Sequence, residues 1–186
     1  MSGWQVRGRA VRVNVIGAAI APGEAPPGRI RHFGWRSPSE TPEVLSTFDI
    51  LYHPVSFASS IGEATKLSFP SSLPCYLAAG RPILLHGPEF AAASGYLNRT
   101  AAGHVVADYH AAAIYNALCR LVDNPSEYRR LGEAATTAFQ RDFTLATARS
   151  SACSSARNPS ASVPSATIAI RYLAASRAIG PFSVRK

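Results

Sequence analysis

Two adjacent serines, Ser71 and Ser72, stand where a loop is expected to pass into a helix. Ser71 is the expected N-cap, and Pro74 suits the first helical turn. The free amide N–H groups of a helix N-terminus, together with the helix dipole, favour an anion. With two hydroxyl donors beside those amides, the segment predicts a site for a diphosphate, formed without a glycine-rich motif.

Three charged or titratable side chains are candidates for the same ligand. Lys66 precedes the two serines and is one of only two lysines in the chain, with Lys186. His86 ends an expected strand, and Glu89 follows it at the start of an expected helix. Each has an alternative role: a solvated loop lysine, a histidine satisfied at a strand end, and a carboxylate favoured by a helix N-terminus.

Strand and helix signals alternate along the chain with short loops. Residues 82–86 form a continuous apolar run, which is typical of a strand buried on both faces. A loop is expected after the strand that ends at Pro54, and Asn124 with Pro125 and Glu127 predicts a capped helix start. Strands are expected near 11–16, 29–33, 48–52, 82–86 and 103–107, and helices near 38–48, 71–80, 90–98, 114–122 and 125–139. This alternation predicts an α/β fold, a Rossmann-like parallel sheet with helices on both faces, which binds ligands at the carboxyl ends of its strands.

The run from Ser68 to Pro82 carries a family resemblance. It reads Ser-Phe-Pro-Ser-Ser, then Tyr-Leu-Ala-Ala-Gly at the helix end, then Arg-Pro. It resembles the C-terminal, donor-binding domain of retaining, sugar-nucleotide-dependent glycosyltransferases of the two-Rossmann-domain (GT-B) type. The resemblance covers roughly residues 11–143, and it also includes Phe33-Gly34-Trp35.

The resemblance implies a nucleotide-diphosphate sugar as donor substrate and no other cofactor. The nucleotide base would lie near Phe33 and Trp35, and the diphosphate would face Ser71 and Ser72. Ser72 stands where the family often has Lys, and Cys75 stands where it usually has an acidic residue for the ribose. The loss of both charge-assisted contacts would weaken donor binding by several kcal/mol.

The resemblance also implies that the chain is one half of such an enzyme, truncated at its N-terminus. The acceptor-binding domain, or a separate protein in its place, would then be a partner, and the isolated chain is expected to be inactive. No catalytic residue is nominated. The alternative is a degenerate, non-catalytic Rossmann-like module that acts through a protein partner. A dinucleotide-binding oxidoreductase is not favoured, because no GxGxxG motif follows the first strand.

Composition divides the chain into three parts. Residues 1–10 are an N-terminal extension, 11–150 form the expected domain, and 151–186 are a Ser/Ala-rich tail expected to be disordered or non-native. The formal charge is +8, but residues 1–150 carry 14 Lys and Arg against 11 Asp and Glu, whereas the tail carries five basic residues and no acidic one. A basic stripe of the kind that binds nucleic acid is therefore not expected.

The remaining signals exclude other classes. The three cysteines and five histidines share no metal-ligand spacing, and an odd number of distant cysteines does not predict a disulfide framework. No apolar run approaches the roughly 20 residues that span a bilayer. We therefore expect no metal site, no transmembrane segment and a cytoplasmic protein, at most peripheral to a membrane.

Overall fold

The structure is a computed structural model that describes residues 5–17, 30–37, 39–144 and 167–173. The strands are β1 (Gln5–Val6), β2 (Arg9–Ile16), β3 (Ile30–His32), β4 (Ile50–Pro54), β5 (Ile83–His86), β6 (Gly103–Val106) and β7 (Thr167–Leu173). The helices are α1 (Thr41–Ser46), η1 (Ser59–Ile61), α2 (Gly62–Leu67), α3 (Leu73–Ala78), α4 (Ala92–Thr100), α5 (Ala111–Asp123) and α6 (Pro125–Asp142).

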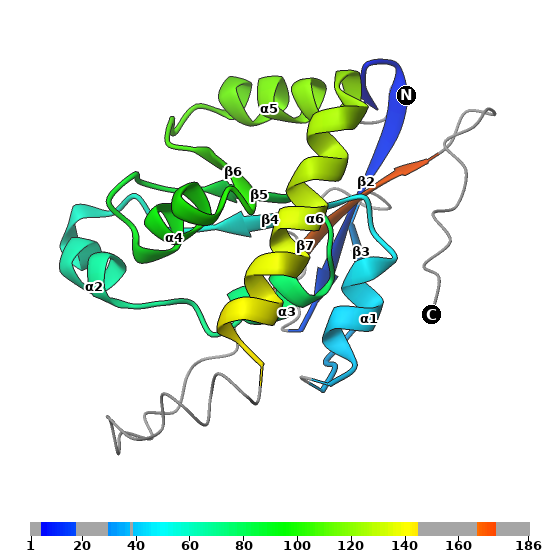
Figure 1. Cartoon of the computed structure of the whole chain (residues 1–186). Helices are drawn as coiled ribbons and strands as arrows, with labels where there is room; N and C mark the ends of the chain where they lie inside the picture. The colour runs from blue at the N-terminus through cyan, green and yellow to red at the C-terminus, as the bar shows by residue number, and fades with distance from the viewer. Residues whose placement is uncertain (1–4, 18–29, 38, 145–166, 174–186) are drawn as a thin grey trace.

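All seven strands form one sheet in the order β1-β2-β7-β4-β5-β6, and β3 also pairs with β2. β4, β5 and β6 are mutually parallel, and β3 is parallel to β2. β7 is antiparallel to both β2 and β4, so β2 and β4 point the same way. The predicted α/β fold is confirmed, with two antiparallel strands, β1 and β7, added to its parallel strands (Figure 1).

Two of these strands lie where the sequence analysis expected no element. β1 and the first two residues of β2 belong to the expected N-terminal extension. β7 lies inside the Ser/Ala-rich segment and fills the gap between β2 and β4. Its residues, Thr-Ile-Ala-Ile-Arg-Tyr-Leu, are mostly β-branched, aromatic or apolar, which suits a central strand. The composition averaged over residues 151–186 conceals this short run; the rest of that segment lies outside the described residues.

Helices cover both faces of the sheet. On one face, α1, α3 and α4 pack over Leu51, Ile83 and Leu85, with Tyr76 fully buried among them. On the other face, α5 packs over Ile50, Leu84 and Val106. Because Leu84 and Leu85 are neighbours on β5 and face opposite sides, β5 is buried on both faces, as its apolar run predicts.

Helix α6 passes the amino ends of the strands and contacts both cores (Figure 1). The Tyr128 hydroxyl donates to the carbonyl of Asp49, just before β4, at 2.7 Å. Gly132 packs on Gly80, just before β5, so closely that a Cβ on Gly132 would lie 2.7 Å from the Gly80 carbonyl oxygen. Helix α6 therefore lies across the amino ends of β4 and β5.

The structure confirms some of the helix starts and loops predicted from local sequence and contradicts others. The predicted start of α6 is confirmed, because the Asn124 side chain accepts from the Glu127 amide at 3.2 Å. The loop expected after β4 contains η1 and α2 instead. The expected Ser71 cap is wrong: α3 begins at Leu73, and Ser72 occupies its N-cap position without a side-chain cap bond.

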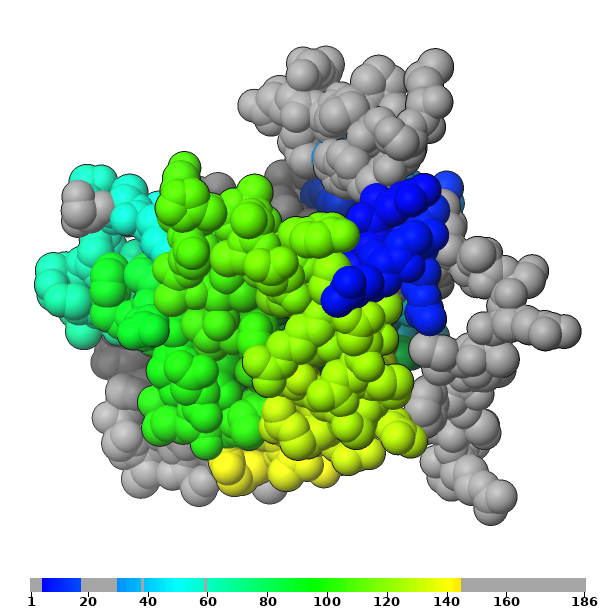
Figure 2. Space-filling view, turned by 90° about the horizontal axis from the view of Figure 1, so that it is seen from above, coloured from blue at the N-terminus to red at the C-terminus, as the bar shows by residue number. Residues whose placement is uncertain are grey.

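Figure 2 shows the N-terminal residues against the end of α5, where Arg7 and Asp123 form an exposed ion pair.

Candidate functional site at the carboxyl edge of the sheet

The carboxyl ends of β2, β3, β4, β5 and β6 lie along one edge of the sheet because these strands share one direction. Backbone hydrogen bonds continue beyond the strand ends, from Val55 N to His86 O at 2.8 Å and from Gly87 N to Val106 O at 3.1 Å. Gly87 is required here, since a Cβ would lie 2.6 Å from the Cβ of Val55. The edge therefore carries closely held loops, which can place side chains accurately.

Two buried polar atoms without partners border Tyr76 at the middle of this edge. Ser72 Oγ and His53 Nε2 are both buried and have no hydrogen-bond partner among the described residues. The His53 ring meets the Tyr76 ring edge to face, with centroids 5.2 Å apart, and the Tyr76 amide donates to the Ser72 carbonyl. Burial lowers the pKa of His53 to about 4, so its imidazole is neutral near pH 7.

Ser71, just before α3, and Cys75, on α3, flank Ser72 in the chain. Ser71 is exposed, whereas Cys75 is half-buried and packs against the core under α3. Burial raises the pKa of the Cys75 thiol, so it stays protonated near neutral pH. Cys75 therefore lacks the negative charge that the resemblance associates with this place.

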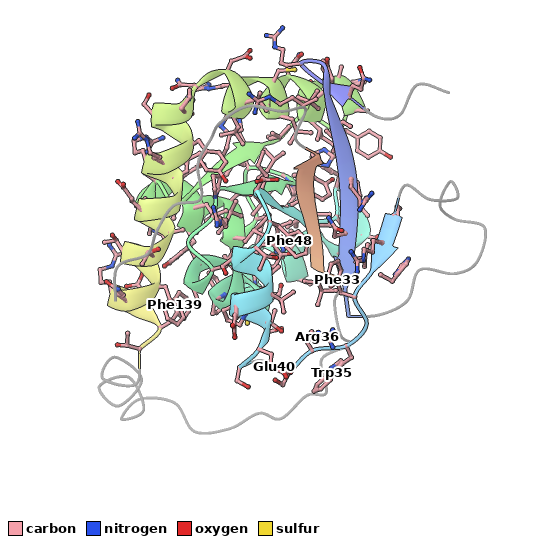
Figure 3. The ribbon with its side chains drawn as sticks, turned by 90° about the vertical axis from the view of Figure 1, so that its right-hand side faces the viewer. Phe33, Trp35, Arg36, Glu40, Phe48 and Phe139 are labelled. Atoms are coloured by element: carbon pink, nitrogen blue, oxygen red, sulfur yellow. The ribbon has the colours of Figure 1, made fainter. Side chains whose placement is uncertain are left out.

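Phe33 and Trp35, after β3, behave differently from each other. Phe33 packs edge to face on Phe48, with centroids 5.4 Å apart, and the Arg31 guanidinium lies 4.9 Å from the Phe33 ring centre. Trp35 is 68% exposed. Figure 3 shows Phe33 directed toward Phe48, and Trp35 at the end of the sheet. Phe33 is thus partly a packing residue, and Trp35 offers an exposed aromatic face.

Lys66 and Glu89 lie on the α2 and α4 side of the edge. Lys66 Nζ is 2.8 Å from Glu63 Oε1 and 5.7 Å from the ring centre of Phe90. Glu89 is exposed and precedes Phe90 in the chain. The structure therefore brings Lys66 close to the segment that carries Glu89, and pairs its charge with Glu63.

His86 is held from both sides of its ring. Its Nδ1 lies 2.9 Å from the Tyr52 hydroxyl, and its Nε2 lies 2.9 Å from the carbonyl oxygen of Asp108. A carbonyl only accepts, so in the neutral ring Nε2 donates to Asp108 and Nδ1 accepts from Tyr52. Burial raises the pKa of Tyr52, which keeps this hydroxyl protonated.

The predicted site residues divide between the two faces of the sheet. Leu85 packs in the same core as Tyr76, and His86, the next residue on β5, faces the opposite side with Tyr52. Phe33 and Trp35 follow β3, which β2, β7 and β4 separate from β5. Ser71, Ser72 and Cys75 therefore form one group, and His86 belongs to another.

Sequence reasoning missed several residues at this edge. Phe57 lies with its ring centre 5.1 Å from that of His86 and 5.5 Å from that of Tyr109. His53 was considered only as a metal ligand. Side chains alternate between the two faces along β4, so Tyr52 and His53 point to opposite faces of the sheet. This alternation could have placed His53 with the group around Ser72 and Tyr52 with His86. The meeting of Phe57 with Tyr109 had no signal in the sequence.

Other kinds of site find no support in the described residues. Within the described ranges, no three His, Cys, Asp or Glu side chains are grouped as a metal ion requires. Among the helices described, none is long and apolar enough to cross a membrane.

Comparison with known proteins bears on the fold. No protein-family model and no curated protein matches the sequence. Among solved structures, the chain is similar to the crystal structure of HepE from Anabaena in complex with UDP, with a TM-score of 0.50 and 13% sequence identity. The similarity shows a shared α/β fold. The similarity covers 67% of this chain and 31% of that one, so the chain matches less than a third of the length of HepE.

Proposed function

We propose that residues 11–150 are the donor-binding half of a glycosyltransferase of the GT-B type, and that they bind a nucleotide-diphosphate sugar at the carboxyl edge of the sheet. The observation that carries the proposal is the shared fold with HepE, which was crystallised with UDP. In open α/β sheets, ligands bind outside the carboxyl ends of the strands. Since α6 lies across the amino ends of β4 and β5, the carboxyl edge is the favoured place.

In this proposal, the diphosphate lies over Ser71 and Ser72. A buried hydroxyl without a partner costs about 1–3 kcal/mol, which a phosphate oxygen would recover after a small shift of the preceding loop. Lys66 would leave Glu63 for the diphosphate, and this exchange is inexpensive because exposed ion pairs contribute about 0–1 kcal/mol. The proposed diphosphate would supply the partner that the Ser72 hydroxyl lacks among the described residues.

The other predicted residues take the remaining parts of the donor. The base would stack on Trp35 beside Phe33, and the ribose would lie near Cys75. His86 and Glu89 would border the sugar. Transfer to an acceptor would then require an acceptor-binding domain or a separate protein, and this chain by itself would be inactive.

Calorimetric titration of the full chain with UDP, GDP and ADP tests the proposal. Saturable binding of one nucleotide is expected, and Ser72→Ala should weaken it, whereas Ser68→Ala, at an exposed serine, should leave it unchanged. Binding that is absent from a folded sample, or that is insensitive to Ser72→Ala, contradicts the proposed site.

The departures at Ser72 and Cys75 favour the alternative function, a degenerate module that acts through a protein partner. The double variant Ser72→Lys, Cys75→Glu separates the two readings. A donor site should bind the nucleotide at least roughly tenfold more tightly once a lysine meets the diphosphate and a carboxylate meets the ribose. No gain in a folded double variant favours the module.

A further inference from the structure

Four aromatic rings join the carboxyl ends of β4, β5 and β6. Tyr52 lies in β4 and Phe57 follows it, His86 ends β5, and Tyr109 follows β6. Neighbouring ring centres are 6.1 Å apart for Tyr52 and His86, 5.1 Å for His86 and Phe57, and 5.5 Å for Phe57 and Tyr109. The outermost ring, Tyr109, is 75% exposed.

This row is anchored to the sheet at its inner end. His86 is fixed by two hydrogen bonds of 2.9 Å, one of which holds the carbonyl of Asp108, the residue before Tyr109. An exposed aromatic side chain on a loop is ordinarily free to reorient. Here the Tyr109 ring rests edge to face on Phe57, and the carbonyl of the preceding residue is hydrogen-bonded to His86 of β5. These contacts set the orientation of the Tyr109 ring.

Hydrogen-bonding groups lie next to the exposed ring. Asp108 is exposed, and its Oδ1 accepts from the His110 amide at 2.9 Å and contacts the His110 ring at 2.7 Å. These bonds from His110 lower the pKa of Asp108, so the carboxylate is ionised near neutral pH. Tyr109 is therefore flanked in the chain by a carboxylate and an imidazole, which are paired with each other.

We propose that Phe57, Tyr109 and the Asp108–His110 pair form a binding surface for a sugar ring. One face of a pyranose presents C–H groups with partial positive charge, and these are attracted to the negative face of an aromatic ring. Its rim presents hydroxyl groups, which donate to carboxylates and imidazoles. The identification of the ligand as a sugar rests on the proposed function. The bound pyranose belongs either to the donor or to a glycan acceptor.

The test measures binding of UDP, UDP-glucose and free maltotriose to the full chain and to Tyr109→Ala. Tyr109 is exposed, so the variant is expected to fold, which thermal unfolding verifies. Loss of the aromatic face should weaken sugar binding roughly fivefold. Tyr109→Trp should keep the affinity, and Tyr115→Ala, at a half-exposed tyrosine of α5, is the matched control.

The pattern of losses identifies the source of the sugar. A weaker affinity for UDP-glucose with unchanged affinity for UDP assigns the surface to the donor sugar, and a weaker affinity for maltotriose assigns it to an acceptor glycan. If UDP does not bind but maltotriose binds through Tyr109, the proposed donor function fails and the sugar surface stands. If UDP binds and Tyr109→Ala changes neither sugar ligand, the sugar surface is overturned. If no ligand binds, both the donor function and the sugar surface are overturned.

Discussion

The Tyr52 hydroxyl and His86 Nδ1 lie 2.9 Å apart and join the carboxyl ends of β4 and β5. This bond sets the protonation of the neutral ring, because Nε2 must donate to the carbonyl of Asp108. A single side chain, that of His86, therefore connects three neighbouring strands through two hydrogen bonds, since Asp108 follows β6.

Tyr52→Phe removes the donor to His86 and leaves Nδ1 without its partner. We expect the free energy of unfolding to fall by about 1 kcal/mol, the usual contribution of such a bond. Chemical denaturation measures the change, and ¹⁵N NMR of the histidine rings should show His86 with a hydrogen on Nε2 in both proteins. Tyr109→Phe, at an exposed hydroxyl, is the control, and a hydrogen on Nδ1 in the unaltered protein would contradict this arrangement.

Buried His53 predicts a stability loss in mild acid. Its pKa is about 4 in the folded chain, below the ordinary value of 6.5, because burial disfavours the charged ring. The unfolded chain therefore takes up the proton first, and stability present above pH 6.5 is lost as the pH falls toward 4, by roughly 3 kcal/mol.

The variant His53→Phe checks this assignment because it keeps an aromatic ring against Tyr76 and cannot titrate. Urea unfolding between pH 7 and pH 4 should show a flatter dependence in His53→Phe than in the unaltered chain. His32→Phe, at an exposed ring, should retain the full slope. An unchanged slope in His53→Phe would assign the loss to other groups.

The contact between α6 and the turn after α3 depends on Gly132. Its replacement by alanine places a Cβ 2.7 Å from the backbone oxygen of Gly80, and should lower the free energy of unfolding by about 1–3 kcal/mol. The matched control is Gly95→Ala in α4, where the nearest atom is the end of Arg99 at 3.6 Å. That change should be neutral or stabilising by up to about 1 kcal/mol, since alanine favours a helix. Equal effects of the two changes would contradict the packing.

The central position of β7 makes the C-terminal segment part of the fold. Seven residue pairs join β7 to β2 and three join it to β4, so its removal leaves both strands with unpaired edges. A chain that ends at residue 166 should melt at a lower temperature and self-associate in size-exclusion chromatography. A chain that ends at residue 173 keeps β7 and should behave as the full chain does. If the two shortened chains are equally stable, β7 does not contribute to the sheet.

Much of the fold was predictable because its signals are local. The apolar run of β5, the cap at Asn124 and the alternation of strands and helices depend on neighbouring residues, and the structure confirms them. β7 was not predictable from the average composition of its segment, and its pairing between β2 and β4 joins positions more than a hundred residues apart.

The candidate site was predictable only in part. The sequence could indicate Ser72 at a helix start and His86 at a strand end, but not that they belong to opposite sides of the sheet. The pair of Lys66 with Glu63 is local, three residues apart on α2, whereas the row from His86 to Tyr109 depends on how the loops after β4 and β6 fold over the edge. Such loop contacts follow from tertiary packing, which no residue spacing encodes.

The central claim, that a nucleoside diphosphate binds at Ser72 on the carboxyl edge, is tested most directly by an NMR titration of the ¹⁵N-labelled full chain with UDP. If UDP binds at the carboxyl edge, we expect saturable shifts of the amides from Ser68 to Tyr76 and beside Trp35, with no shifts at the amino edge near Asp49 and Gly132. Ser72→Ala should reduce these shifts at equal UDP concentration. A spectrum that UDP leaves unchanged, or shifts concentrated at the amino edge, would contradict binding at the carboxyl edge.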